Sequence, residues 1–460
     1  MKTLPPDPIQ QMGIAQFGIL LRRGEITSEV VTRQYLERIT ALNPKLGAYV
    51  YVAENAAVES AQGIDRLIAA GTDLGPLMGV PIAVKDIFAV EGMPTKVGSE
   101  MDISDLIPPE GNFIKTLKRS GCVILGKTRT IEFAAGAQNV KHPTSWNPWD
   151  ANIHRTPGGS SSGSAVALAA GLCAFAIGTD TGGSVRLPAA LCGIFGLKPS
   201  VGLWPMDGVF PLCPAMDTIG LMTNSASDAA YIYSTLTDKT VQHPRPLEGL
   251  LLGRPKNHFF NNLHPQIQKD TQKIIAMLNN SGVQFISIEF PEVEEVVELF
   301  SKMVPADLVT TLGPERFFNN RDVLDPVLID RLSPALELSA VEYIRLLRRQ
   351  KELARIGVKR IAGLDGWICP TTPVLPVPVS LCESVEEASA FTFKALQNTR
   401  PANIYGYCSS TLPVILQRSD LPVSMQLHCG SSEESKLLSI SLAVEQLVGT
   451  PQKPDIGKFI

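Results

Sequence analysis

Residues 156–202 read TPGGSSSGSAVALAAGLCAFAIGTDTGGSVRLPAALCGIFGLKPSVG, and this segment is the most informative one about the fold. After a first Gly/Ser turn it contains a short alanine-rich helix at 165–170 and a buried apolar strand at 173–177. A second glycine-rich turn ends at Ser184, and Pro188 suits the first position of a further helix. Two such turns around a helix–strand unit favour a site that uses backbone N–H groups.

Helices and strands alternate on both sides of this segment, which predicts an α/β fold rather than a sandwich. The other elements that we expect are helices over 28–42 (capped by Ser28), from the 50s to about 70 and from the Ser339 capping box to near 363, and strands over 47–52, 80–84, 122–126 and 367–369.

Composition excludes several classes of function. The chain of 460 residues carries a net charge of −4 without a basic stripe, which argues against a nucleic-acid partner. Its longest apolar run, residues 165–177, is shorter than the about 20 residues of a membrane span. Eight cysteines without a C-x-x-C pair indicate buried free thiols, so we expect a cytoplasmic protein. No histidine pattern indicates a metal, and no cofactor is expected.

Each glycine-rich turn is weak evidence when it is taken alone. The first, GGSSSGS, is usual in flexible linkers and phosphate loops, but it lacks the lysine of a P-loop. On the second turn, Ser184 would lie beside backbone donors, and Ser160 on the first turn could hydrogen-bond to it. No histidine or carboxylate stands nearby at the spacing of a catalytic triad.

The combination of the two turns resembles the amidase signature family, whose hallmark is a Gly/Ser-rich segment of this kind. The resemblance covers roughly residues 20–450. The other matching segments are 75–86 (GPLMGVPIAVKD), 121–128 (GCVILGKT), 217–220 (DTIG), 369–373 (CPTTP) and 421–426 (LPVSMQ).

The resemblance implies one large domain over residues 1–460, with a mixed, twisted β-sheet core covered by helices on both faces. Within it we expect N-terminal helices at about 1–70, a signature core at about 75–225, a variable helical insertion at about 250–362 and a return to the core at about 363–450. Two-fold homodimers are common in that family and among soluble proteins, but no segment identifies an interface.

Residue by residue, the resemblance implies a Ser-cisSer-Lys triad: the base is Lys85, the bridging serine is Ser160 after a cis peptide bond, and the nucleophile is Ser184. It implies an oxyanion hole formed by the N–H groups of Thr181, Gly182, Gly183 and Ser184, and supporting roles for Asp180, Arg186 and Ser161. Ser162 stands where the family often has glycine, so a positive φ would strain it.

The proposed chemistry requires a neutral lysine, because a serine hydroxyl is a poor nucleophile until a base removes its proton. The ordinary lysine pKa is about 10.4, and lowering it by about three units costs roughly 4 kcal/mol. Desolvation can do this, and Lys85 follows an apolar strand. The alternative role for Lys85 is a salt bridge with Asp86 or another carboxylate.

The sequence thus predicts an amidohydrolase that cleaves a small or aryl carboxamide, or a related carbamate, urea or ester, with a small-molecule amide and water as its partners. An alternative is the glutamine-hydrolysing subunit of a tRNA-dependent amidotransferase. Such subunits carry an aspartate where our alignment places Leu396, and no acid occurs between Glu387 and Asp420. The intact triad disfavours an idle scaffold. Residues 138–144, 204–216 and 297–345 are expected to form an apolar acyl pocket.

Overall fold

Eleven strands form one mixed β-sheet in the computed structural model, which describes residues 4–241, 243–414, 421–449 and 452–460. The strands are β1 Tyr49–Val52, β2 Pro81–Lys85, β3 Val123–Thr128, β4 Phe175–Asp180, β5 Phe195–Lys198, β6 Thr218–Thr223, β7 Leu251–Pro255, β8 Gln284–Ile288, β9 Gly366–Pro370, β10 Cys408–Pro413 and β11 Ser424–Cys429. Their order across the sheet is β1-β3-β2-β4-β6-β5-β10-β11-β9-β7-β8.

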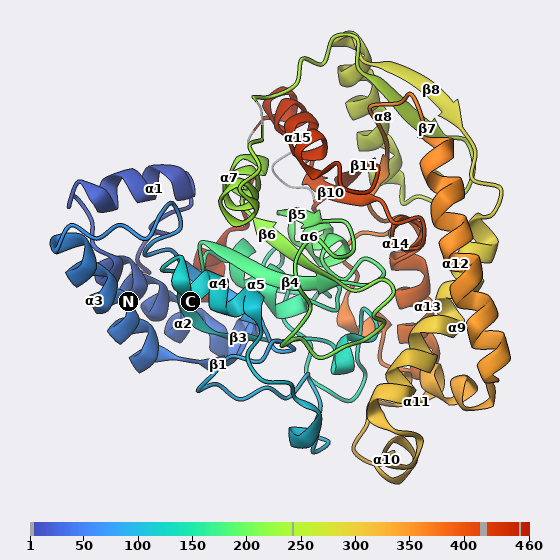
Figure 1. Ribbon diagram of the computed structural model, residues 1–460, viewed down its shortest axis with the longest axis horizontal. Helices are drawn as coiled ribbons and strands as arrows, with labels where there is room; N and C mark the ends of the chain where they lie inside the picture. Colours follow the sequence, from blue (N-terminus) through green and yellow to red (C-terminus); the bar gives the residue numbers. More distant parts are fainter. Residues whose placement is uncertain (1–3, 242, 415–420, 450–451) are drawn as a thin grey trace.

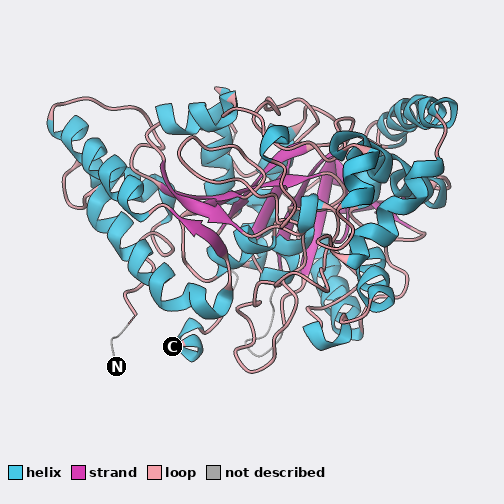
Figure 2. Ribbon diagram, turned by 90° about the horizontal axis from the view of Figure 1, so that it is seen from below, coloured by secondary structure: helices cyan, strands magenta, loops and turns pink. Residues whose placement is uncertain are grey.

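Helices cover both faces of this sheet, as Figure 2 shows. They are α1 Gly13–Arg22, α2 Ser28–Leu46, α3 Glu54–Ala69, α4 Asn112–Arg119, α5 Ser162–Ala169, α6 Arg186–Cys192, α7 Ala226–Thr237, α8 Pro265–Asn280, α9 Val293–Leu312, α10 Pro314–Asn319, α11 Pro326–Leu332, α12 Ala340–Arg360, α13 Val385–Ala395, α14 Arg400–Ile404 and α15 Glu434–Val448. Short 3-10 helices span Ser104–Leu106, Glu132–Ala134, Ser333–Glu337, Val379–Leu381 and Ile456–Phe459. Within the described ranges, none of the helices combines the length and apolar character needed to cross a membrane. The α/β prediction is confirmed.

The centre of the sheet positions the candidate site. Strand β2 lies between β3 and β4 and runs parallel to both, so the carboxyl ends of the three strands meet at one edge. Ligand sites in α/β sheets gather at such an edge. Lys85 is the last residue of β2, and Asp180 is the last residue of β4.

Helix α5 is buried along its whole length, which explains its alanine, serine and glycine content. A Cβ atom at Gly163 would lie 2.2 Å from the carbonyl oxygen of Ala48 and 2.4 Å from the nitrogen of Arg129. Only small residues allow this close approach to the neighbouring backbone. Ser162 is the first residue of the helix and is not among the residues with positive φ, so the expected strain does not arise.

Three local predictions need correction. The cap of α2 is Thr27, whose side chain accepts from the Val30 N–H, and not Ser28. Pro188 is the third residue of α6, which begins at Arg186. The segment from about 250 to 362 is not only helical, because β7 and β8 extend the sheet at one end. Ser339 does cap α12, and all eight cysteines are buried and unpaired as predicted.

Candidate active site

Lys85 is completely buried and holds the centre of the site. Its Nζ lies 2.8 Å from Ser160 Oγ and 3.0 Å from Thr179 Oγ1. Burial lowers the pKa of Lys85 to about 7, against the opposing attraction of Asp180 and Asp217. Asp86 does not pair with it, because its Oδ1 lies 2.8 Å from Lys127 Nζ. The salt-bridge alternative with Asp86 is therefore wrong, and the lysine is poised to lose its proton near neutral pH.

The two glycine-rich turns touch each other through their backbones. The peptide bond between Gly159 and Ser160 is cis, as the resemblance implied. The carbonyl of Ser160 accepts a hydrogen bond of 3.0 Å from Ile131, and the N–H of Ser161 donates to the carbonyl of Ser184 at 3.2 Å. These contacts bring the Ser160 and Ser184 turns together beside Lys85.

Ser184 is the candidate side chain that opens into a cavity, with 6% of its surface exposed. Within the described part of the chain its hydroxyl makes no hydrogen bond, and Ser160 is not bonded to it. The backbone N–H groups of Thr181, Gly182 and Ser184 have no acceptor among the described residues. The N–H of Gly183 differs, because it donates to Asp180 Oδ1 at 2.8 Å.

A buried polar network locks the nucleophile turn. Asp180 accepts from Arg186 Nη2 at 2.9 Å and from Asn403 Nδ2 at 2.9 Å, and Arg186 Nη1 lies 3.3 Å from Gln426 Oε1. Burial alone would raise the pKa of Asp180, but the charge and hydrogen bonds of Arg186 lower it well below the ordinary value. Asp180 therefore stays ionised, and we assign the pair a structural role, as the sequence suggested.

Besides Asn403, sequence reasoning missed three residues that contact Lys85 or hold the same turn. Thr179 contacts Lys85 as described above, and Thr399 Oγ1 donates to the carbonyl of Gly182 at 2.7 Å. Asp217 Oδ1 accepts from Thr181 Oγ1 at 2.5 Å. Asp217 was visible only as part of the DTIG segment, and Thr399 carries no local signal because it approaches from the far end of the chain.

A cavity of about 410 Å³ opens over Ser184. Its lining residues are Ala134, Ala135, Gly136, Thr181, Gly182, Ser184, Leu212, Phe300, Ser301, Val304, Pro305, Asp330, Arg331, Ser389, Ala390, Thr392, Phe393, Leu396 and Arg400. The predicted ranges 204–216 and 297–345 contribute, whereas 138–144 does not. The prediction of an apolar pocket is incomplete, because Asp330, Arg331 and Arg400 bring charge. Residues 389–400 were missed, although they supply one wall.

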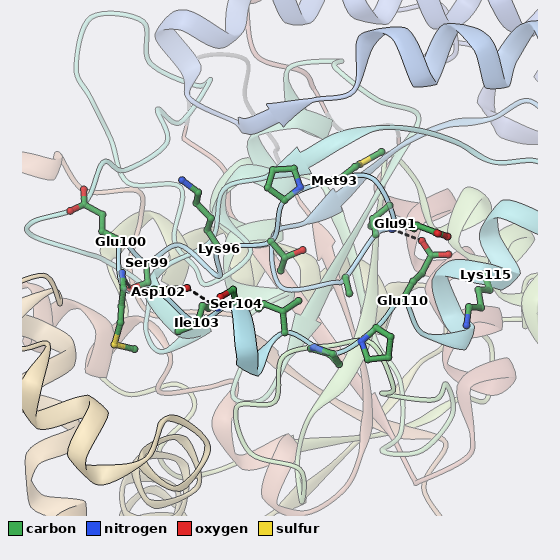
Figure 3. A pocket seen from close by; sticks show the side chains of 18 residues that line it. Glu91, Met93, Lys96, Ser99, Glu100, Asp102, Ile103, Ser104, Glu110 and Lys115 are labelled. Atoms are coloured by element: carbon green, nitrogen blue, oxygen red, sulfur yellow. Dashed lines mark hydrogen bonds between the residues drawn. The ribbon is translucent and has the colours of Figure 1, made fainter.

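A second, more open cavity of about 1000 Å³ is lined by residues between 89 and 115 and is shown in Figure 3. Its rim carries both charges, with Glu91, Glu100 and Glu110 opposed by Lys96 and Lys115. One wall is tied together by the N–H of Glu91, which donates to Glu110 Oε2 at 2.7 Å. None of the candidate catalytic residues lines it, so we place the chemistry in the smaller cavity.

Comparison with known proteins agrees with this geometry. A family model described as Amidase matches residues 30–438. The chain belongs to the amidase family. It is 34% identical to 2-amino-5-chloromuconic acid deaminase of Comamonas testosteroni, with 95% of this chain and 96% of that protein aligned. It is 33% identical to one of the subunits of the glutamyl-tRNA(Gln) amidotransferase of Hahella chejuensis, over 91% and 94% of the two chains.

Solved structures of this amidase family share the whole fold. A crystal structure of an amidase superposes with a TM-score of 0.86 at 26% identity, covering 95% of this chain and all of the other. The peptide amidase of Stenotrophomonas maltophilia gives a TM-score of 0.81 at 26% identity, covering 98% of this chain and all of the other. The protein is therefore a hydrolase that acts on carbon–nitrogen bonds.

Proposed function

We propose that this amidase cleaves a small carboxamide through a seryl acyl-enzyme, with Ser184 as nucleophile, Ser160 as proton relay and Lys85 as base. The observation that carries the proposal is the position of Lys85: it is fully buried, lies 2.8 Å from Ser160 Oγ, and has a pKa lowered to about 7 by burial. An ordinary surface lysine would be charged at neutral pH and could not accept a proton.

The first half of the reaction forms the acyl-enzyme. Neutral Lys85 takes the proton of Ser160, which takes the proton of Ser184 as Ser184 Oγ bonds to the substrate carbonyl carbon. The oxyanion is stabilised by the unpaired N–H groups of Thr181, Gly182 and Ser184. Because the Gly183 N–H already donates to Asp180, we give Gly183 the role of shaping the turn, which revises the four-donor expectation.

Attack by Ser184 gives a tetrahedral intermediate. As it collapses, the proton held on Lys85 returns through Ser160 to the leaving nitrogen, the C–N bond breaks, and the acyl-enzyme is complete. In the second half, water attacks the acyl carbon and its proton passes along the same relay to Lys85. That proton then returns to Ser184 Oγ as the bond between Ser184 and the acyl carbon breaks and the carboxylic acid departs. Lys85, acting through Ser160, thus serves as base and then as acid in each half of the reaction.

The amidotransferase alternative is disfavoured by the wall of the cavity. Leu396, at the position where our alignment expects the aspartate that holds the amino group of glutamine, lines the cavity as a buried apolar side chain. The same cavity is lined by two arginines, Arg331 and Arg400, and by one exposed acid, Asp330, so its positive charge would disfavour an ammonium group. The eight unpaired cysteines support a cytoplasmic setting, which we propose on that ground.

The test is a mass-spectrometric screen of purified wild type and Ser184→Ala. The panel holds aliphatic amides, aryl amides, anilides, carbamates, ureas, esters, glutamine and 2-amino-5-chloromuconic acid. We expect wild type alone to release a carboxylic acid from a small amide. Turnover of glutamine in preference to the other compounds, or equal turnover by Ser184→Ala, would overturn the proposal.

A further inference from the structure

Arg400 is a buried cation that faces the substrate cavity. It begins α14, is 7% exposed and lines the cavity that opens over Ser184. Its guanidinium carbon lies 5.3 Å from the centre of the Phe300 ring and 5.2 Å from that of Phe393. Its Nη1 makes a long hydrogen bond of 3.4 Å to the carbonyl of Phe393, and its buried Nε has no partner among the described residues.

No carboxylate neutralises Arg400 within the described part of the chain. Arg400 takes part in none of the ion pairs among the described residues. Arg186, the other buried arginine of the site, is paired with Asp180. A desolvated guanidinium without a counter-ion is unfavourable, and proteins generally pair such groups. Two aromatic rings hold the cation in place, but they supply no negative charge for its donors.

A second arginine lines the same cavity. Arg331 lies near the end of α11, and its side chain rests against Gly136, where a Cβ atom would lie 2.5 Å from Nη1. The same Nη1 donates to the carbonyl of Ala135 at 2.5 Å. Burial and, to a smaller extent, the charge of Arg331 lower the pKa of Arg400 to about 9, so the two cations repel each other.

The nearby acids Asp330 and Asp325 attract Arg331, but neither pairs with Arg400. Asp330 lines the cavity but is exposed, and Asp325 accepts hydrogen bonds from the backbone N–H groups of Val140 and Lys141 at 3.0 and 2.8 Å. Arg400 therefore brings a positive charge without an ion pair to the cavity that Ser184 also lines. Guanidinium groups bind planar carboxylates through two parallel hydrogen bonds.

We propose that Arg400, together with Arg331, binds a carboxylate of the substrate, so that the preferred substrates are amides whose acyl part carries a second, ionised carboxyl group. The proposal rests on the function proposed above. Monoamides of short dicarboxylic acids are the simplest members of this class. The cavity that Ser184 and both arginines line has a volume of about 410 Å³, which is enough for such a chain.

The experiment compares matched substrates. Succinamate, glutaramate and adipamate are each paired with the neutral amide in which a methyl group replaces the carboxylate: butanamide, pentanamide and hexanamide. We expect wild type to prefer at least one anionic member by about 100-fold in kcat/KM. Arg400→Met should lose that preference, because kcat/KM should fall far more for the anionic member than for its neutral partner, mainly through KM. Arg400→Lys should retain part of the preference, because a lysine keeps the charge but not the paired donors.

Two controls separate this inference from the proposed function. Arg348→Met removes an exposed arginine on α12 and should change neither series. A fluorophosphonate that modifies Ser184 reports an active nucleophile without any substrate. Binding is measured by how far glutaramate slows this modification, compared with how far pentanamide slows it. Equal protection by both, or equal losses for both series in Arg400→Met, would overturn the carboxylate site. An unreactive Ser184 in wild type would instead overturn the proposed function.

Discussion

The floor and the walls of the cavity are built in opposite ways. The floor, where we propose that catalysis occurs, consists of Lys85, Ser160–Ser161 and residues 179–186. It is buried and is fixed by backbone and buried side-chain hydrogen bonds. The walls are formed by α9, the end of α11 and the segment from α13 to α14, and they include Phe393, which is 58% exposed. Figure 1 shows these helices gathered at the far side of the sheet from α1–α3.

This difference divides the two tasks of an enzyme. A floor fixed by a buried polar network can hold reacting groups at defined distances, which the chemistry requires. Walls made from surface helices can change their side chains without disturbing that network. We therefore expect substitutions in the floor to abolish turnover and substitutions in the walls to change which substrate is used.

The largest expected effect is at the nucleophile. Ser184→Ala should lower kcat by about 10⁴-fold or more, since losing a nucleophile removes covalent catalysis altogether. The matched wall variant is Ser389→Ala, which removes a hydroxyl that lines the same cavity and should change kcat/KM by less than about threefold. Steady-state kinetics on the best amide decides between them. Comparable losses in the two variants would break the division between floor and walls.

Two buried lysines provide the next test. Lys85→Met should lower kcat by about 10²- to 10⁴-fold without lowering the free energy of unfolding, because an apolar chain replaces a desolvated amine that has hydrogen bonds but no ion pair. Lys127 is also buried but pairs with Asp86 at 2.8 Å. Lys127→Met should therefore lower the free energy of unfolding by about 3–5 kcal/mol, because it leaves a buried carboxylate unpaired. Urea denaturation measures the free energy of unfolding of both variants. If Lys85→Met were destabilised as much as Lys127→Met, the assignment of Lys85 as an amine without an ion pair would be contradicted.

Adjacent glycines mark the boundary between floor and wall. A Cβ at Gly183 would lie 2.1 Å from Thr399 Oγ1, and φ there is 123°, so Gly183→Ala should lower kcat by about 100-fold. A Cβ at Gly182 would instead lie 2.3 Å from Cζ of the Phe300 ring. We expect Gly182→Ala to raise KM by about tenfold and to be partly rescued by Phe300→Ala, which should not rescue Gly183→Ala. Kinetics of the single and double variants give the coupling, and its absence at Gly182 would argue against Phe300 as a wall residue.

The smallest effect is expected at Ser162, which directly follows the floor on the first turn of α5. Its Oγ lies 3.4 Å from the carbonyl of Arg129, which is a weak contact. Ser162→Gly should lower the free energy of unfolding by about 0.5–1 kcal/mol through the greater backbone freedom of glycine, and turnover should stay within about twofold. Thermal or urea unfolding with parallel kinetics checks this. A gain of activity would show that the serine does strain the turn.

The same division explains what the sequence could predict. The floor could be predicted because its segments resemble the amidase signature family, and that resemblance alone assigned Lys85, Ser160 and Ser184. The parallel pairing of β2 with β4 explains why Lys85 lies at the same edge of the sheet as the Ser184 turn. The walls escaped because they depend on distant pairing. Arg400 follows no recognisable pattern, and only the packing of α14 against α9 brings it to Phe300. Asn403 and Thr399 reach the floor in the same way, from more than 200 residues away in sequence.

The mechanism depends on buried Lys85 being a neutral base near physiological pH. The direct measurement is the rate at which a fluorophosphonate modifies Ser184, followed by mass spectrometry from about pH 5 to about pH 10. Because protonated Lys85 cannot accept a proton, the rate should fall below a midpoint near the lowered pKa of about 7 and level off above it. Lys85→Met should react slowly and without that midpoint. A wild-type midpoint near the ordinary lysine pKa of about 10, or an unchanged profile in Lys85→Met, would contradict the claim.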